Sequence, residues 1–101
     1  MLIQKNVQSE VVVRLRGEVD HMQAQRLKPE IDELLKNPRV KRLVFEMDDV
    51  SFMDSSGIGV ILGRYRVMKK RGGTVAVSGV GGHVDRIFKM AGLYKLVEKL
   101  G

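Results

Sequence analysis

The segment 52–63 constrains this chain more than any other, because the hydrophobic pattern changes there from that of a strand to that of a helix. The preceding residues 43–47 alternate, as expected of a strand. After Phe52, apolar residues recur every three or four positions, which predicts a helix. Asp54, Ser55 and Ser56 stand between the two patterns. Each can accept the backbone N–H bonds that the first turn of a helix leaves unpaired.

A serine at such a turn has two roles open to it. The ordinary role is to cap the helix. The other is to carry a phosphate, because a helix N-terminus offers free N–H groups and a positive dipole end to an anion. The local sequence does not choose between these roles, nor between Ser55 and Ser56 as the phosphorylated residue.

The rest of the chain also alternates between strand and helix patterns. Apolar residues alternate over 11–16, helical spacing recurs over 24–34 and 84–91, and 74–77 is a short apolar run. We predict an α/β fold with a mostly parallel sheet of four or five strands and three main helices packed mainly on one face. The chain contains no linker, repeat or low-complexity tract, so residues 1–101 should form a single domain.

Several residues should interrupt or end these elements. Gly17 should end the strand expected over 11–16, ahead of a helix that starts at Asp20. The acidic pair 48–49 should form a turn after the strand expected over 43–47. Pro29 should kink the first helix or start it afresh, because proline removes a helical hydrogen bond. Residues 93–100 should add a last strand or a helical turn at the rim.

The net charge of +6 and the pI near 9.9 raise the question of an anionic partner. Lys and Arg are scattered, and the one dense run, 69–71, falls where a helix should end and where cations meet its dipole favourably. Aromatic residues make up 5% and are not interleaved with basic ones, which argues against a base-stacking surface. We expect an acidic protein surface as partner and no direct nucleic acid. A basic nucleic-acid-binding domain is the less favoured alternative.

Composition also limits the cellular setting and the metal chemistry. The sequence has no long apolar run and no cleavable signal pattern, so we expect a cytoplasmic protein without a membrane partner. The absence of cysteine excludes disulfides and thiolate metal sites. His21 has no second ligand at metal-binding spacing, which favours a surface or capping role. We therefore predict no metal site.

Catalysis and nucleotide binding find little support in the residues. The glycines of 57–63 miss the dinucleotide fingerprint by one residue, and no Gly-Lys-Ser or Gly-Lys-Thr follows a glycine cluster. A serine nucleophile needs a base within reach. A weak enzymatic alternative would combine Asp54, Ser55 and His83 at one sheet edge. We predict that the protein is not an enzyme and uses no cofactor.

Ser56, Gly59 and Gly63 lie together on one flank of the predicted helix, with Val60 and Val67 beside them. A helical glycine costs roughly 1 kcal/mol relative to alanine, so two of them need a reason. Either a neighbouring strand or loop of the same domain approaches this flank closely, or a partner protein docks there. The residues leave both explanations open.

Three segments resemble those of a known family in the same order. They are RLRGEVDH at 14–21, DVSFMDSSGIGVILGRYR at 49–66 and FKMAGLYK at 88–95. Along essentially its whole length the chain is similar to the anti-sigma factor antagonists of the STAS domain family, above all to the sporulation members of bacilli and their relatives. Family chains usually extend somewhat further at the C-terminus, so we do not expect their last helix within these residues.

The resemblance implies a single STAS domain that regulates without catalysis. In that family, the unmodified protein binds an anti-sigma factor, itself a serine kinase with bound nucleotide, and so frees the sigma factor. The kinase phosphorylates the serine after the motif aspartate, here Ser55, and a serine phosphatase reverses the change. Asp20 is implied to contact the kinase. The expected partner-binding residues are Asp20, Asp54, Ser55, Ser56, Gly59, Val60, Gly63 and Val67.

Phosphorylation of Ser55 would act at the N-terminal end of the helix flank that carries Ser56, Gly59 and Gly63. It adds about −1.5 to −2 charges at pH 7. A helix N-terminus tolerates such a charge, so we expect little refolding. We expect the phosphate to block docking of the partner by its charge and bulk. The alternative within the same family is a STAS-type scaffold domain of a stress-signalling complex, serving a different partner.

Overall fold

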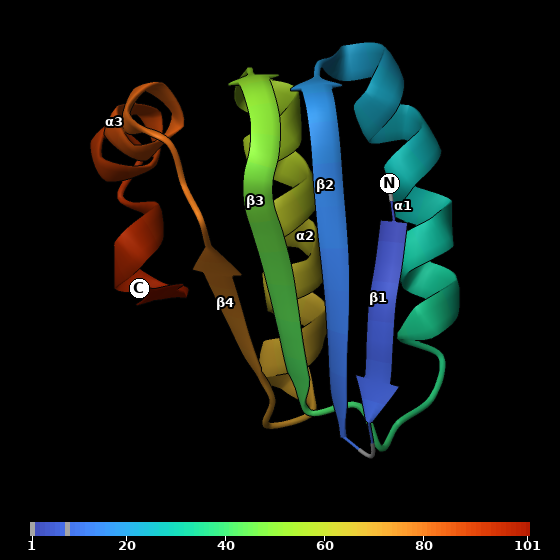
Figure 1. The fold of residues 1–101 in the computed structure, drawn as a ribbon. Helices are drawn as coiled ribbons and strands as arrows, with labels where there is room; N and C mark the ends of the chain where they lie inside the picture. The colour runs from blue at the N-terminus through green and yellow to red at the C-terminus, as the bar shows by residue number, and fades with distance from the viewer. Residues whose placement is uncertain (1, 8) are drawn as a thin grey trace.

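The structure, a computed structural model, describes the backbone of residues 2–7 and 9–101 and the side chains from residue 9 onward. Five strands form one sheet in the order β1-β2-β3-β4-β5 (Figure 1). β1 and β2 form an antiparallel hairpin, and every other neighbouring pair is parallel, as predicted. The strands are β1 Leu2–Val7, β2 Glu10–Val19, β3 Arg42–Met53, β4 Thr74–Ser78 and β5 Glu98–Leu100.

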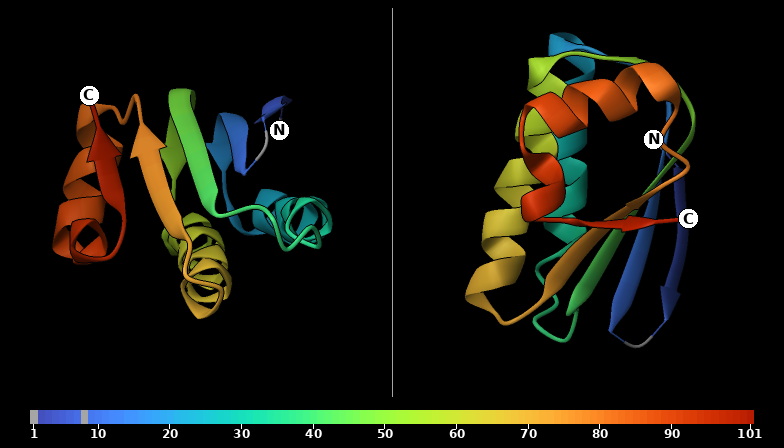
Figure 2. Two further views of the ribbon diagram at one scale, coloured as in Figure 1. Left: turned by 90° about the horizontal axis from the view of Figure 1, so that it is seen from below. Right: turned by 90° about the vertical axis from the view of Figure 1, so that its left-hand side faces the viewer.

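Three α-helices connect the parallel strands, and a short 3-10 helix follows the last of them. α1 and α2 lie against the same face of the sheet, and α3 lies beside β4 and β5 at one edge (Figure 2). The prediction of helices packed mainly on one face is therefore confirmed. The helices are α1 His21–Leu34, α2 Ser55–Lys70, α3 Gly82–Met90 and the 3-10 helix η1 Leu93–Lys95.

The hydrophobic core fills the space between this face and the helices. Alternate residues of β2 and β3 point into it, and α1 and α2 each add one apolar stripe. This packing fixes where the two helices begin relative to the strand ends. The central residues are Val11, Val13 and Leu15 of β2, Leu43, Phe45 and Met47 of β3, Ala24, Leu27 and Ile31 of α1, and Ile58, Ile61 and Met68 of α2.

The expected ends of β2 at Gly17 and of β3 at the acidic pair are wrong, and α1 does not start afresh at Pro29. Gly17 lies inside β2 with a φ of 70°, where the register with β3 shifts, so it forms a bulge instead of an end. The acidic pair 48–49 lies inside β3, because pairing with β2 continues to Met53. Pro29 lies within one continuous helix, at an exposed position where water can satisfy the carbonyl that loses its partner. Residues 93–100 form both expected alternatives, η1 and β5.

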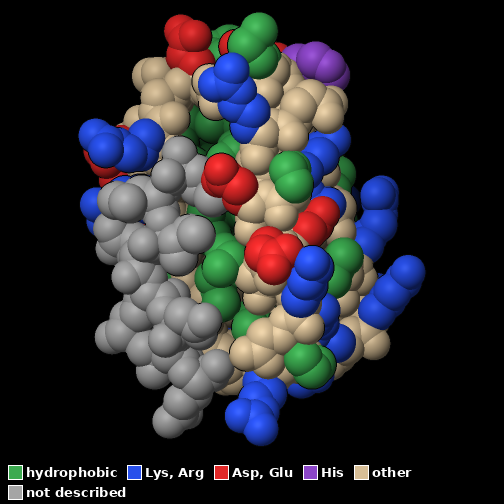
Figure 3. Space-filling view, turned by 90° about the vertical axis from the view of Figure 1, so that its right-hand side faces the viewer, with side chains coloured by type: hydrophobic (Ala, Val, Ile, Leu, Met, Phe, Trp, Pro, Cys, Tyr) green, Lys and Arg blue, Asp and Glu red, His purple; other side chains and the backbone are tan. Residues whose placement is uncertain are grey.

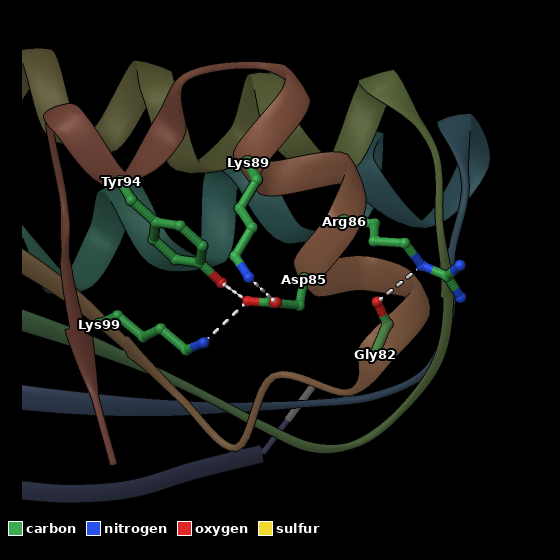
Figure 4. Close-up of polar contacts among 6 residues, drawn as sticks. All are labelled: Gly82, Asp85, Arg86, Lys89, Tyr94 and Lys99. Atoms are coloured by element: carbon green, nitrogen blue, oxygen red, sulfur yellow. Dashed lines mark hydrogen bonds and ion pairs between the residues drawn. The ribbon is translucent and has the colours of Figure 1, made fainter.

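The Asp85 carboxylate holds α3 to the C-terminal segment (Figure 4). The Tyr94 hydroxyl donates to Oδ1 at 2.5 Å, Lys99 Nζ donates to the same oxygen at 2.9 Å, and Lys89 Nζ lies 3.0 Å from Oδ2. These contacts, the Tyr94 hydrogen bond foremost, hold the pKa of Asp85 well below its usual range. Burial, and then the carboxylate, raise the pKa of Tyr94. The Tyr94 ring also meets Phe88 edge to face, with centroids 5.9 Å apart.

The sheet face away from α1 and α2 is shielded by its own side chains. The strand register places Val12, Val44 and Ala76 in one row, with charged residues in the rows on either side. Val44 is only 6% exposed and Ala76 is fully buried, because Arg42 reaches across β4 to Glu98 on β5. The ion pairs on this face are Arg14–Glu46, Arg42–Glu10 and Arg42–Glu98, each at 3.3 Å.

Candidate functional site

The neighbouring parallel strands β2 and β3 end at the same edge of the sheet, and an aspartate that caps a helix follows each of them. Val19 pairs with Met53 at this edge, and the Asp54 N–H donates to the Val19 carbonyl at 3.4 Å. Asp20 accepts a backbone N–H of α1 at 3.0 Å, and Asp54 accepts one of α2 at 2.8 Å. The structure thus brings the two loops together and confirms that α1 starts after Asp20 and α2 after Asp54.

Because Asp54 caps α2, neither serine is needed for capping. Ser55 is the first residue of α2 and is exposed. Its hydroxyl has no hydrogen-bond partner among residues 9–101. Ser56 is half-buried, and its Oγ lies 3.4 Å from Nδ1 of His21 at the start of α1. The two adjacent serines therefore sit in different surroundings, which the sequence alone does not reveal.

The glycines of α2 fall into two kinds. A Cβ at Gly57 would lie 2.5 Å from Cγ of Met53, so this glycine makes room for a buried side chain. A Cβ at Gly59 or Gly63 would meet no described heavy atom within 4 Å. Close approach within the domain therefore does not explain Gly59 and Gly63. The surface around these two residues is open to a partner.

This open flank is narrower than the sequence predicted. Val60 is only 1% exposed and belongs to the core, so its side chain is removed from the expected partner-binding set. The reason is that α2 packs against α1 as well as the sheet, where Arg64 pairs with Asp32 at 3.2 Å. Val67 is half-buried against the core. We call the remaining set, which keeps the half-buried Val67, the serine surface: Asp20, Asp54, Ser55, Ser56, Gly59, Gly63 and Val67.

Two exposed apolar side chains next to the serine surface were missed by the sequence analysis. Met22 follows His21 in α1 and is 64% exposed, and Phe52 precedes the Asp54 loop and is 40% exposed. A signal for both was present, since Met22 falls off the α1 stripe and Phe52 points away from its buried neighbour Met53. Apolar residues exposed singly are common on protein surfaces, so these two side chains do not by themselves define a contact surface.

Among the described residues, no metal centre surrounds the serines. Within residues 2–7 and 9–101, no group of three or more His, Cys, Asp or Glu residues could hold a metal ion. The histidine that contacts the serine loop is His21, whereas the enzymatic alternative relied on His83 of α3. Over the same part of the chain, no helix has the length and apolar character to cross a membrane. The arrangement presents an accessible hydroxyl at a helix N-terminus.

Charges of both signs are mixed on one face of the molecule. Figure 3 shows Lys and Arg side chains from the top to the bottom of one face, with Asp and Glu side chains between them. Basic residues also close α2, at Lys69 and Lys70. This distribution differs from the continuous basic stripe typical of nucleic-acid-binding proteins. It agrees with the preference for a protein partner.

The arrangement of four parallel strands and three helices defines the class of protein to which the chain belongs. Residues 2–100 match the STAS domain, so the chain belongs to the STAS domain family. The fold expected from the sequence resemblance is therefore confirmed.

The most informative relatives are regulators. The chain is 39% identical over 87 residues to the Anti-sigma F factor antagonist of Paenibacillus polymyxa, covering 86% of this chain and 74% of that protein. It is 29% identical over 94 residues to the Anti-sigma-B factor antagonist of Bacillus subtilis, covering 93% and 84%. The resemblance to anti-sigma factor antagonists is thus confirmed.

Two solved structures of such an antagonist share the fold. The anti-sigma factor antagonist SpoIIAA in its unphosphorylated form matches with a TM-score of 0.87 at 27% identity, covering 99% of this chain and 87% of that one. The Bacillus cell fate determinant SpoIIAA in the phosphorylated form matches with a TM-score of 0.79 at 26% identity, covering 99% and 90%.

Proposed function

We propose that this chain is an anti-sigma factor antagonist that is switched off by phosphorylation of Ser55. In the unphosphorylated state it binds an anti-sigma factor, a serine kinase with bound nucleotide, through the serine surface, and the sigma factor is released. Phosphorylation by that kinase ends the association, and a serine phosphatase restores it. The protein acts by binding and not as an enzyme, and it works in the cytoplasm beside these partners.

The observation that carries the proposal is the exposed Ser55 hydroxyl at the N-terminus of α2, free of the capping role that Asp54 fills. A kinase can reach this hydroxyl, and its modification leaves the cap in place. Ser55 also lies at the N-terminal end of the flank of α2 on which Gly59 and Gly63 have no described heavy atom within 4 Å of an added Cβ. A partner that packs along this flank meets Ser55 directly.

Asp20 supports the same docking mode. It follows β2 at the edge where β3 leads into Ser55, and the two loops are joined by the backbone bond between Asp54 and Val19. One of its carboxylate oxygens caps α1, and the side chain remains partly exposed. A partner seated on Ser55 and Gly59 therefore also reaches Asp20.

A phosphate on Ser55 should leave the fold intact and change the surface. Near the N-terminus of α2 its charge gains roughly 0.3 to 1 kcal/mol from the helix dipole, less some repulsion from Asp54. SpoIIAA supports this expectation, since both its unphosphorylated and its phosphorylated forms share the present fold, with TM-scores of 0.87 and 0.79. We infer that docking is blocked by charge and bulk.

The test is phosphosite mapping with candidate anti-sigma kinases and ATP. The relatives include antagonists named for anti-sigma F and for anti-sigma-B factors, so a kinase of each kind should be tried. We expect a phosphate on Ser55, no incorporation into Ser55→Ala, and loss of the kinase complex after modification. A stable kinase complex that never labels Ser55 would contradict the proposed switch.

A further inference from the structure

Ser55 and Ser56 are neighbours at the start of α2, yet only one of them has a free hydroxyl. Ser55 is exposed, and its hydroxyl contacts no hydrogen-bond partner among residues 9–101. Ser56 is half-buried, its N–H donates to Asp54 Oδ1 at 2.8 Å, and its Oγ lies 3.4 Å from His21 Nδ1. The second serine is therefore held on both its backbone and its side chain.

The fold itself brings His21 to this place. Asp20 caps α1 and so fixes His21 as the first residue of that helix. The pairing of Val19 with Met53, and the bond from the Asp54 N–H to Val19, fix the start of α1 against the start of α2. The contact thus links segments that are 35 residues apart in the sequence.

Phosphoryl transfer needs a serine oxygen that is free on two sides. Its lone pair must face the γ-phosphorus in line with the leaving oxygen, and the same oxygen must lie within about 2.6 to 3.2 Å of the kinase's base to pass on its proton. At Ser56 one of these sides is taken by His21 in either ring state. When Nδ1 carries no proton it accepts a hydrogen bond from the Ser56 hydroxyl, and when Nδ1 is protonated it donates one to Oγ.

We propose that His21 determines which serine is modified: it holds the Ser56 hydroxyl against α1 and leaves Ser55 as the acceptor. This role rests on the proposed function, the phosphorylation of Ser55. In the reaction, Ser55 Oγ forms a bond to the γ-phosphorus of a nucleoside triphosphate, and the bond to the β,γ-bridging oxygen breaks. The nucleoside diphosphate leaves, and the serine proton passes to the kinase's base. His21 acts as a positioning residue and not as a catalytic one.

The experiment isolates Ser56 by removing its competitor. The variants S55A, S55A/H21A and S55A/H21N are incubated at saturating concentration with an anti-sigma kinase that labels the wild-type chain, and phosphate on Ser56 is measured by mass spectrometry. Asparagine can place an amide group near the position of Nδ1. The matched control S55A/Q25A alters another exposed residue of α1, and circular dichroism checks that each variant is folded.

We expect background labelling in S55A, S55A/H21N and S55A/Q25A, and labelling of Ser56 roughly 2- to 10-fold faster in S55A/H21A, as one modest hydrogen bond allows. If His21 had only a structural role, asparagine at this position would not restore background labelling of Ser56.

If Ser56 is labelled no faster in S55A/H21A than in S55A, while Ser55 of the wild type is labelled normally, His21 does not select the serine. The proposed function then remains intact. Equal labelling in S55A/H21A and S55A/H21N also overturns the selection role, because the hydrogen bond is then not the cause. A wild-type chain that binds the kinases but is labelled on neither serine overturns the proposed function first, and the selection role with it.

Discussion

Replacing Gly59 and Gly63 together by alanine should stabilise the free protein and weaken its complex with the kinase. A Cβ at either position meets no described heavy atom within 4 Å, so alanine fits both sites. Within a helix, alanine is favoured over glycine by about 0.8 to 1 kcal/mol per site. The double variant G59A/G63A should therefore be more stable than the wild type by about 1.5 to 2 kcal/mol.

Urea unfolding followed by circular dichroism measures this gain. With a slope of roughly 1 to 2 kcal/mol per molar urea for a small domain, the midpoint should rise by about 1 M or more. The matched control is Gly57→Ala in the same helix. There the new Cβ would lie 2.5 Å from Cγ of the fully buried Met53, so the propensity gain should be cancelled or reversed.

Titration against an anti-sigma kinase with its nucleotide measures the second half of the prediction. Two methyl groups on the open flank should separate the docked surfaces and lower the affinity by about tenfold or more, which corresponds to about 1.4 kcal/mol. Gly63→Leu should act in the same direction and more strongly. A stabilised G59A/G63A protein that binds the kinase as tightly as the wild type would refute the docking role of these glycines.

The remaining predictions concern the switch and the stability of the fold. Ser55→Asp should weaken kinase binding while its circular dichroism spectrum stays that of the wild type; tight binding would contradict a block by charge. Arg71→Met should lower the free energy of unfolding by about 2 kcal/mol in urea titrations, because the guanidinium donates to three backbone carbonyls after α1 at 2.7 to 3.4 Å. The control Arg66→Met, at an exposed position, should change the free energy of unfolding by less than about 0.5 kcal/mol. Folding lowers the pKa of Asp85, so its ionised form stabilises the protein above the unfolded pKa of about 4, and this contribution is lost as the pH falls below that value. The melting temperatures of the wild type and Asp85→Asn should therefore converge as the pH falls from about 5 towards 2; a difference that stays constant would contradict the linkage.

Much of the fold and part of the site could be predicted because they depend on local chemistry. Asp20 and Asp54 each stand just before a helical pattern, and capping is completed within two or three residues, so both helix starts were correct. The strand faces of β2 and β3 followed from period-two alternation, which burial on one face enforces. The position of Ser55 at the start of α2 followed from the same local signals.

The errors arose where distant segments decide the outcome. β3 runs through its acidic pair 48–49 because β2 continues to offer pairing partners, and Gly17 forms a bulge for the same reason. Val60 is buried because α1 covers part of α2, which a single helical wheel does not represent. The spacing of the α2 glycines likewise could not separate Gly57, which accommodates Met53, from those that face outward.

The sheet face opposite α1 and α2, which its own charged side chains shield, allows this fold to form from a short chain. Parallel sheets are usually covered by helices on both sides. Here the salt-bridged arginines and glutamates over Val44 and Ala76 replace a second helical layer. An exposed apolar sheet face would tend to associate with other copies of the chain, whereas a charged face remains hydrated. We therefore expect this face to stay free of contacts with other copies of the chain, so that a short sequence can support a parallel sheet with a single helical layer.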